Sequence, residues 1–472
     1  MGRPKVAVAG ASGYIGSCLI QALLPHFDVI ALSRTPKPDS PGVEWRYCDL
    51  FSLLQAEMGL QGADYAFYLV HSMLPSAHLS QGHFADMDLI LADNFARACQ
   101  QTGVEHIVYL GGIIPEFGEL SSHLRSRLEV EHTLADYRVP VTSIRASIIV
   151  GPRGSSFQII EKLVKRLPIM LCPPWTLTQT QPIALDDVIQ ILVKTLGQKE
   201  LYWRFFDVGG PDILSYLDLM KETARVMNLK RLILPLPWMP IHLSRFWVSL
   251  IASAPPELVN PLVESLKYPM VAHSLELQRM LEIDGLGFSE AVEKALLAQS
   301  QAPTARPAKR AKYTESLQFS DNIYPESEKV VRSVQRLPLP AGKNALWIAE
   351  KYTLWLPRFL HPFVRVDVDS QRTCRFYLKG IHSPLLVLKF SVERSNLHRT
   401  LFYITGGLLA SRKTRLRGRL EFREVLGQNY VIAAIHDFSP SLPWFIYNWT
   451  QALMHLWVMH GFRRYLRSLD VL

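Results

Sequence analysis

The residues with the clearest chemical meaning are three glycines near the N-terminus, Gly10, Gly13 and Gly16. They follow an apolar run that predicts a strand, Val6–Ala9, and they open a segment with helical spacing. Gly10 permits a tight turn, Gly13 lets the backbone approach a pyrophosphate, and Gly16 lets helix pack on strand. The helix N-terminus adds amide donors for phosphate. The pattern predicts a dinucleotide site, against the alternative of a turn that binds nothing. Its other candidate residues are Ser12, Tyr14 and Ile15.

In dinucleotide sites of this kind, the residues at the end of the second strand determine the choice of cofactor. Here these residues are Ser33 and Arg34. NAD-binding proteins usually place a carboxylate there for the ribose hydroxyls, whereas an arginine suits a 2′-phosphate. The sequence therefore favours NADP(H), unless Arg34 is a solvated loop residue. Asp49 and Leu50, after the third strand, are placed to meet the adenine edge; an aspartate that merely closes a turn explains the position nearly as well.

Composition limits the class of protein. The chain has 472 residues, of which 48% are hydrophobic and 20% charged, with a mean hydropathy of +0.08. These values exclude intrinsic disorder and a disulfide-stapled miniprotein, and the length favours two domains. Five cysteines without a CxxC pair predict neither a disulfide framework nor a metal site, so we expect no metal and a reducing compartment. The N-terminal residues leave no room for a signal peptide, which predicts a cytoplasmic protein.

The positive charge is concentrated in one part of the chain. Residues 1–302 carry 25 Lys and Arg against 30 Asp and Glu, whereas residues 303–472 carry 26 against 12. A basic region of this kind suits an anionic surface such as lipid headgroups, although a solvated face that keeps the protein soluble explains it equally well. No nucleic-acid motif accompanies the charge. We therefore expect no nucleic-acid partner, and peripheral association with the inner face of the membrane is the alternative to a wholly cytoplasmic location.

The order of elements predicts the fold. Over the first 300 residues short apolar runs alternate with helical patterns, which is typical of a doubly wound parallel α/β (Rossmann) sheet. The predicted strands are Val6–Ala9, Val29–Ser33, Ala66–Val70, Ile107–Gly111, Val141–Ile149 and Phe205–Val208, and the predicted helices Gly16–Leu24, Asp86–Thr102 and Ser122–Tyr137. Residues 298–316 contain two prolines and no apolar periodicity, so they predict a linker.

Beyond the linker, residues 317–472 change to short strands and predict a basic α+β domain with an antiparallel sheet. The predicted strands are Phe363–Asp367, Cys374–Lys379, Leu385–Val392, Arg399–Thr405, Arg415–Val425 and Tyr430–Asp437. A long helix, Pro443–Arg467, ends the domain. It lies in a stretch without charged residues from Phe438 to Phe462, and we favour a core helix over an interfacial or a membrane-spanning one.

Several motifs together resemble a known family. They are GASGYIG at 10–16, LVHSM at 69–73, LGG at 110–112, HLRSRLEVE at 123–131, VPVTSIRASIIVGPRGSSF at 139–157 and QPIALDDV at 181–188. In this order they resemble the NmrA-like, atypical branch of the extended short-chain dehydrogenase/reductases over roughly residues 5–297. The resemblance implies an NAD(P)-binding domain with a small substrate subdomain over 1–297. It is closest to bacterial proteins that carry a second, START-like domain, which here corresponds to 317–472.

The resemblance also locates the catalytic positions. Typical members use a Ser or Thr with a Tyr and a Lys spaced YxxxK, in which the tyrosine protonates the substrate oxygen. The matching positions here are His123 and Arg127, with Gly111-Gly112 in place of the Ser or Thr. Alcohol–ketone chemistry of the usual kind is therefore not expected, and His123 is either a substitute acid or a surface histidine. By its place in the pattern His71 lies beside the cofactor, unless it is an ordinary loop residue.

The substrate pocket of this fold usually follows the sixth strand. Ser155, Ser156, Phe157 and Trp175 occupy that region and, unless they only pack the core, favour a large apolar ligand. Two hypotheses follow: an NADP(H)-dependent reductase of a bulky apolar substrate, and a non-catalytic NADP(H)-dependent sensor or assembly factor that meets membrane, lipid or protein. The sequence leaves the substrate and the oligomeric state open.

Overall fold

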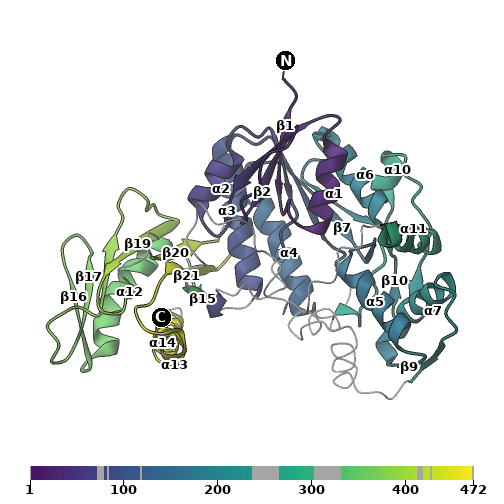
Figure 1. Ribbon diagram of the computed structural model, residues 1–472. Coiled ribbons are helices and arrows are strands. Elements are labelled where there is room, and N and C mark those ends of the chain that lie inside the picture. The colour runs from purple at the N-terminus through teal and green to yellow at the C-terminus, as the bar shows by residue number, and fades with distance from the viewer. Residues whose placement is uncertain are drawn as a thin grey trace. The chain divides into compact units, whose positions relative to one another are not determined.

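The computed structural model describes residues 2–71, 79–81, 84–116, 120–236, 265–301, 331–411, 418–425 and 428–469. The chain forms two compact units (Figure 1). The first consists of residues 1–74 and 91–310, and the second of residues 75–90 and 311–472. The second unit thus includes residues 75–90, which the sequence predicts as part of the first domain.

The first unit is built on a seven-stranded parallel sheet, as predicted (Figure 1). In spatial order its strands are β12 (Arg204–Val208), β7 (Val141–Ala146), β6 (His106–Gly112), β4 (Tyr65–Tyr68), β1 (Lys5–Ala9), β2 (Asp28–Ser33) and β3 (Val43–Tyr47). Because β1 lies between β4 and β2, the chain winds outward from the middle in both directions. The carboxyl ends of the central strands meet at one edge, where ligands bind in sheets of this kind.

Helices cover both faces of this sheet. On one face α1 (Tyr14–Leu23) and α6 (Leu185–Thr195) pack over strand residues such as Val6 and Val8. On the other face α3 (Phe84–Thr102) places the ring of Phe95 5.0 Å from that of Tyr68 on β4. The remaining helices between the central strands are α2 (Leu53–Leu60) and α4 (Ser122–Ala135).

A smaller subdomain completes the first unit. Its core joins α5 (Ser155–Arg166), α7 (Tyr216–Val226) and α11 (Phe288–Gln301) with short elements at the same end. The short elements are β8 (Ile149–Val150), β9 (Ile169–Cys172), η1 (Pro174–Leu177), β10 (Gln179–Thr180), β11 (Ile183–Ala184), β13 (Leu214–Ser215) and β14 (Leu232–Pro235). By contrast, η2 (Lys199–Leu201) and α10 (Glu276–Met280) pack against the core of the parallel sheet. The predicted strand 141–149 is therefore two strands. Helix α11 continues four residues into the predicted linker, whose remainder lies outside the described residues.

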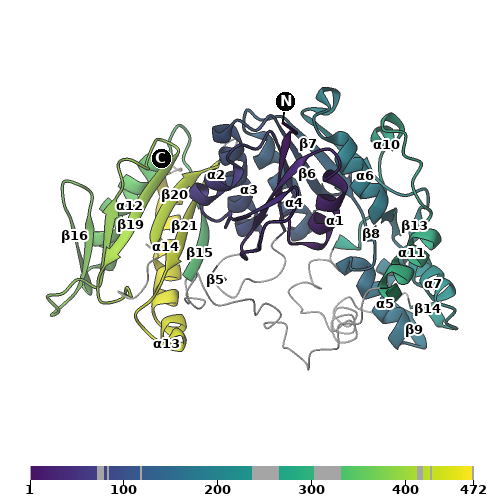
Figure 2. The same cartoon turned by 45° about the horizontal axis from the view of Figure 1, so that its top comes forward.

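The second unit contains the predicted antiparallel sheet (Figure 2). In spatial order its seven antiparallel strands are β16 (Val364–Val368), β17 (Cys374–Leu378), β18 (Leu386–Phe390), β19 (Arg399–Gly406), β20 (Arg419–Glu424), β21 (Tyr430–Phe438) and β15 (Val331–Pro338). Six of them confirm predicted strands, although residues 412–417 are not described, and β15 was not predicted. An eighth strand, β5 (Leu79–Gln81), pairs in parallel with β15 at the edge.

Helices pack on one face of the second sheet. Helix α12 (Ala345–Leu360), which was not predicted, brings Tyr352 within 5.1 Å of the ring of Phe462 on α14 (Gln451–Leu469). The predicted single helix 443–467 is wrong: Thr450, with φ −125° and ψ −81°, separates α14 from α13 (Trp444–Trp449). Among the described residues, no helix has both the length and the apolarity needed to cross a bilayer.

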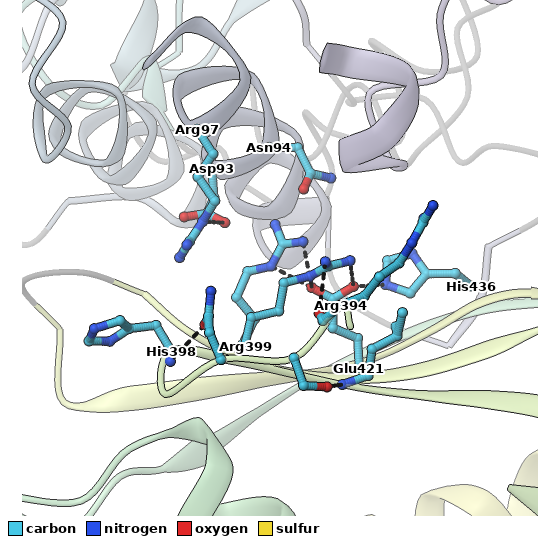
Figure 3. Close-up of polar contacts among 12 residues, drawn as sticks. Asp93, Asn94, Arg97, Arg394, His398, Arg399, Glu421 and His436 are labelled. Carbon is cyan, nitrogen blue, oxygen red and sulfur yellow. Dashed lines mark hydrogen bonds and ion pairs between the residues drawn. The ribbon is translucent and has the colours of Figure 1, made fainter. Parts of the chain in front are cut away.

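A buried ionic cluster lies on the opposite face of the second sheet (Figure 3). The carboxylate of Glu421 accepts from the guanidinium of Arg399 at 2.9 Å, and it also pairs with Arg423 and His436. Burial opposes ionisation, but the two arginines outweigh it and hold the pKa of Glu421 well below its usual range. The cluster therefore keeps a charged carboxylate inside this face by pairing it.

The predicted basic surface of the second unit is partly engaged within the unit. Arg419 pairs with Asp437 at 2.6 Å, and Arg463 donates to the carbonyl of Arg336 at 2.7 Å. Arg464 and Arg467 are exposed, whereas the neighbouring basic residues Arg412, Lys413, Arg415 and Arg417 of the same region lie outside the described residues. Membrane association through this surface stays a prediction.

Candidate functional site

The glycine-rich loop is too tight for larger side chains at two of its three glycines. Gly10 has φ +88°, and a Cβ there would lie 2.9 Å from the carbonyl oxygen of Leu69. A Cβ on Gly16 would lie 2.3 Å from the carbonyl oxygen of Gly10. Gly13 caps α1 without any side-chain hydrogen bond to the first-turn amides. The loop is therefore a tight cradle below an uncapped helix N-terminus, which fits the pyrophosphate of a dinucleotide.

The other residues of the loop differ in their placement. Ser12 is exposed, and Ile15 lines a cavity at the carboxyl edge of the parallel sheet. Tyr14 does not line that cavity; a Cβ on Gly151 would lie 2.6 Å from its hydroxyl oxygen. Burial raises the pKa of Tyr14 to about 12. A role of Tyr14 in binding a cofactor stays a prediction.

The predicted adenosine-side residues lie at the ends of β2 and β3. Ser33 is buried, and its hydroxyl accepts from the amide of Thr35 at 3.1 Å. Arg34 is exposed and is paired with no carboxylate of the described residues. Asp49 accepts from the amide of Phe51 at 3.1 Å, so its side chain does close a turn. Leu50 is buried beside it. Their cofactor roles stay predictions.

A cavity of about 330 Å³ opens at the carboxyl edge of the parallel sheet. The ends of β4, β6 and β7 and the first turns of α4 and α5 line one part of it. The rest is formed by α5, η1 and α7, together with residues 265–270. The cavity thus joins the predicted cofactor edge to the small subdomain.

The two predicted catalytic residues and His71 meet at this cavity. Ser121 begins α4 by accepting from the amide of Leu124, which places His123 in the first turn and Arg127 one turn later. The rings of His71 and His123 lie 5.3 Å apart between centroids. His71 is exposed, whereas burial lowers the pKa of His123 to about 4. At pH 7 the His123 ring is therefore neutral.

Arg127 is the notable charge of the cavity. It is 7% exposed, and burial lowers its pKa to about 10. No carboxylate of the described residues forms an ion pair with it. A guanidinium buried in this way is costly unless an acceptor satisfies it. The arrangement fits a bound group that is rich in oxygen, such as a ribose or a phosphate.

The structure explains the glycines in place of the usual serine or threonine. A Cβ on Gly111 would lie 2.8 Å from the ring of Tyr109, so that ring occupies the space of a side chain. Gly112 lines the cavity beside it. The donor that the family places here is therefore absent at these two positions.

Sequence reasoning missed a polar group on the cavity wall. Ser147 and Thr180 share a hydrogen bond of 2.5 Å, and the hydroxyl of Tyr216 also bonds Thr180. Burial raises the pKa of Tyr216 to about 12, so this phenol stays protonated. The sequence feature that indicates a helix beginning at Tyr216 is the capping box of Ser215 and Asp218, which starts α7 there.

The far part of the cavity is mainly apolar. Trp175, Ser155 and Ser156 line it as predicted, and its apolar wall includes Ile159, Leu163 and Met220. Phe157 does not line it. That side chain is fully buried in the core of the subdomain, because it lies on the opposite side of α5.

Comparisons with known proteins agree with this fold. Residues 6–200 match the NAD dependent epimerase/dehydratase family. The auxiliary protein GraX of Staphylococcus aureus is 33% identical over 113 residues, which are 23% of this chain and 37% of that protein's length. Two solved structures are each covered over 99% of their length, both with a TM-score of 0.51. One, a nucleoside-diphosphate-sugar epimerase from S. aureus, is 12% identical over 61% of this chain; the other, triphenylmethane reductase from Citrobacter sp., is 18% identical over 62%.

The first unit therefore has the fold of NAD-dependent epimerases, dehydratases and reductases of the extended short-chain type. At these identities the solved structures establish the fold and assign no substrate. The START-like resemblance of residues 317–472 stays a prediction.

Proposed function

We propose that the first unit binds NADP(H) and transfers hydride between it and a bulky, largely apolar acceptor. The observation that supports this most is the continuity of one cavity from Ile15, beside the glycine-rich loop, past His123 and Arg127 to the apolar wall on α5 and α7. When bound, the nicotinamide supplies the hydride. The chain's own contribution is to position the reactants and to exclude water from them.

The residues divide this work between the two ends of the cavity. The cradle of Gly10, Gly13 and Gly16 would hold the pyrophosphate, and Arg34 would meet a 2′-phosphate. At the buried end of the cavity, Arg127 would donate hydrogen bonds to ribose or phosphate oxygens. Without a Tyr–Lys pair, we favour acceptors that need little acid catalysis at oxygen, such as quinones or conjugated enones.

A non-catalytic NADP(H)-dependent sensor or assembly factor is the second candidate. It is favoured by Gly111 and Gly112 at the Ser/Thr position and by the neutral ring of His123. On this reading the cofactor changes a binding equilibrium and no acceptor is turned over. Both candidates require the nucleotide site.

NADPH oxidation at 340 nm, measured with a panel of quinones, enones and triphenylmethane dyes, distinguishes the two. We expect turnover with at least one acceptor, and its loss in Ile159→Trp, which fills the apolar wall. Ile169→Trp is the matched control, because that side chain is 58% exposed on β9 and outside the cavity. Tight NADPH binding with no turnover across the panel would favour the sensor, and no NADPH binding would overturn both.

A further inference from the structure

Strands β9 and β14 form a two-stranded parallel sheet in the small subdomain, beside α5 and α7 (Figure 2). Because side chains alternate along a strand, each face of this sheet takes every second residue. Met170 and Ile233 belong to the inner face and are buried in the core of the subdomain. The outer face consists of two cross-strand pairs, Ile169 with Leu232 and Leu171 with Leu234. We call these four side chains the aliphatic face.

The aliphatic face is exposed to solvent. The exposed fractions are 58% for Ile169, 51% for Leu232, 53% for Leu171 and 44% for Leu234. Parallel sheets are normally covered on both faces, and a sheet with one wet face normally carries polar side chains there. This sheet does neither. Exposed apolar side chains that form a contiguous patch mark an interaction surface, whereas scattered ones do not.

Basic residues come directly before both strands. Helix α5 ends with Lys165 and Arg166 just before β9, and Lys230 and Arg231 precede β14. The guanidinium of Arg231 donates to the carbonyl of Val164 at 2.6 Å and to that of Lys165 at 3.1 Å. These hydrogen bonds hold the start of β14 against the end of α5. The basic residues of the two segments therefore lie together at one border of the aliphatic face.

The charge of this border is positive. Residues 162–172 and 229–236 contain five Lys or Arg and neither Asp nor Glu. One of the five, Lys165, pairs with Glu161 on the preceding turn of α5 at 2.5 Å. Arg166 and Lys230 are exposed. The border thus offers positive charge next to an apolar surface.

An anionic lipid surface matches this combination. Binding at a membrane interface draws on the burial of apolar side chains and on the attraction of basic side chains to anionic headgroups. A protein partner matches less well, because protein interfaces are enriched in aromatic side chains and depleted of lysine. The aliphatic face has no aromatic member and is bordered by two exposed lysines, Lys165 and Lys230.

We propose that the first unit docks on anionic membranes through β9 and β14. The aliphatic face enters the headgroup region, and the basic border lies against the anionic headgroups. This surface is separate in sequence from the basic surface of the second unit. The proposal goes beyond the function proposed above and does not depend on whether the first unit turns over an acceptor.

The test is flotation of the full chain with two kinds of vesicle, one of phosphatidylcholine alone and one with about 30% phosphatidylglycerol. We expect binding to the mixed vesicles at about 0.05 M NaCl and at least fivefold weaker binding at about 0.5 M, because salt screens exposed charges. Vesicles of phosphatidylcholine alone should bind at least tenfold more weakly. No binding to the mixed vesicles, or equal binding to both compositions, would overturn the proposal.

A double variant of the aliphatic face tests the location. Leu171→Gln with Leu234→Gln should weaken binding to the mixed vesicles at least tenfold; Ile169→Gln with Leu232→Gln replaces it if it does not fold. The matched control is Leu54→Gln with Met58→Gln on α2, two side chains with exposed fractions of 41% and 65%. It should bind vesicles as the unmutated chain does. Unaltered binding in a folded variant of the aliphatic face would overturn the site.

A second double variant tests the basic border. Arg166→Gln with Lys230→Gln should weaken binding at low salt at least fivefold, whereas Lys5→Gln with Lys199→Gln, the same change of charge at two other exposed positions, should not. Equal losses in the two would overturn the role of the border. Sedimentation velocity covers the remaining occupant. A dimer that is lost when the aliphatic face is changed would assign that face to a second copy of the chain and overturn membrane docking.

Discussion

The imidazole rings of His71 and His123 face one another across the cofactor edge of the first unit, with centroids 5.3 Å apart and planes inclined by 34°. Burial keeps His123 neutral, so the two rings approach without repulsion between like charges. His123 occupies the position of the family's tyrosine. A neutral polar ring therefore stands where that family places its proton donor.

The neutrality of His123 can be measured directly. With a folded pKa of about 4, the Hε1 resonance of this ring should not move between pH 5.5 and 8 in spectra of histidine-labelled protein. The spectrum of His123→Asn assigns the resonance. A midpoint near 6.5, the value of an unperturbed histidine, would contradict the burial argument.

Replacement of Arg127 should weaken NADPH binding without lowering the stability of the fold. Arg127→Met removes a buried charge that has no ion-pair partner among the described residues, so the melting temperature should stay level or rise. NADPH affinity should fall roughly ten- to a hundred-fold, since a charge-assisted hydrogen bond contributes about 1.5–3 kcal/mol. Calorimetry and thermal melting provide the two measurements. Arg125→Met, an exposed change on the same helix, should alter neither.

Arg34 should decide the cofactor preference. Its exposed guanidinium follows β2 directly and has no carboxylate partner within the described part of the chain. Arg34→Ala should weaken NADPH roughly ten- to a hundred-fold and leave NADH unchanged, because only NADPH carries the 2′-phosphate. Titration calorimetry with both nucleotides tests this. Equal affinities for the two in the unmutated protein would refute the preference.

His106 should make the first unit sensitive to acid. The amide of Gly197 donates to its Nδ1 at 3.1 Å, so Nε2 carries the proton and donates to Thr142 at 2.9 Å. The Thr142 hydroxyl then donates to the carbonyl of Leu201 at 2.7 Å. Burial lowers the pKa of His106 to about 4. This hydrogen-bonded chain requires the neutral ring.

The sign of that effect follows from proton uptake. Between pH 6.5 and 4 the unfolded chain binds a proton at this position and the folded chain does not, so the free energy of unfolding falls as pH falls. The loss between pH 7 and 5 should be about 2 kcal/mol for His106. Urea unfolding at several pH values should show a smaller slope in His106→Gln. An unchanged slope would exclude this histidine as a source of acid sensitivity.

The parallel sheet was predictable because its strands are buried apolar runs and its loop has glycines where side chains would collide. Residues far apart in the sequence were harder to place. Met270 reaches the cavity from a segment that carries no motif, and the capping box before Tyr216 predicts a helix start without indicating that its ring lines a cavity. Their position depends on tertiary packing, which periodicity does not encode.

In the second unit, α12 had a signal that was overlooked. Asn344 precedes an apolar periodic run and caps it by accepting from the amide of Trp347 at 2.9 Å. The break at Thr450 had no such signal, because neither proline nor glycine stands there. The composition of residues 443–467 suits a helix, but the prediction of one continuous helix is wrong because the chain breaks at Thr450.

Strand β5 belongs to the second unit although it precedes that unit's other strands by a long stretch of sequence. It pairs with β15 although some 250 residues separate them. Residues 331–472 alone would leave the outer side of β15 as an open strand edge, which is a template for pairing with another molecule. Two chains that exchanged β5 would form a domain-swapped dimer, in which the same pairing of β5 with β15 forms between chains. Refolding at high concentration should therefore favour dimers, and lengthening the connection on either side of β5 should shift their population.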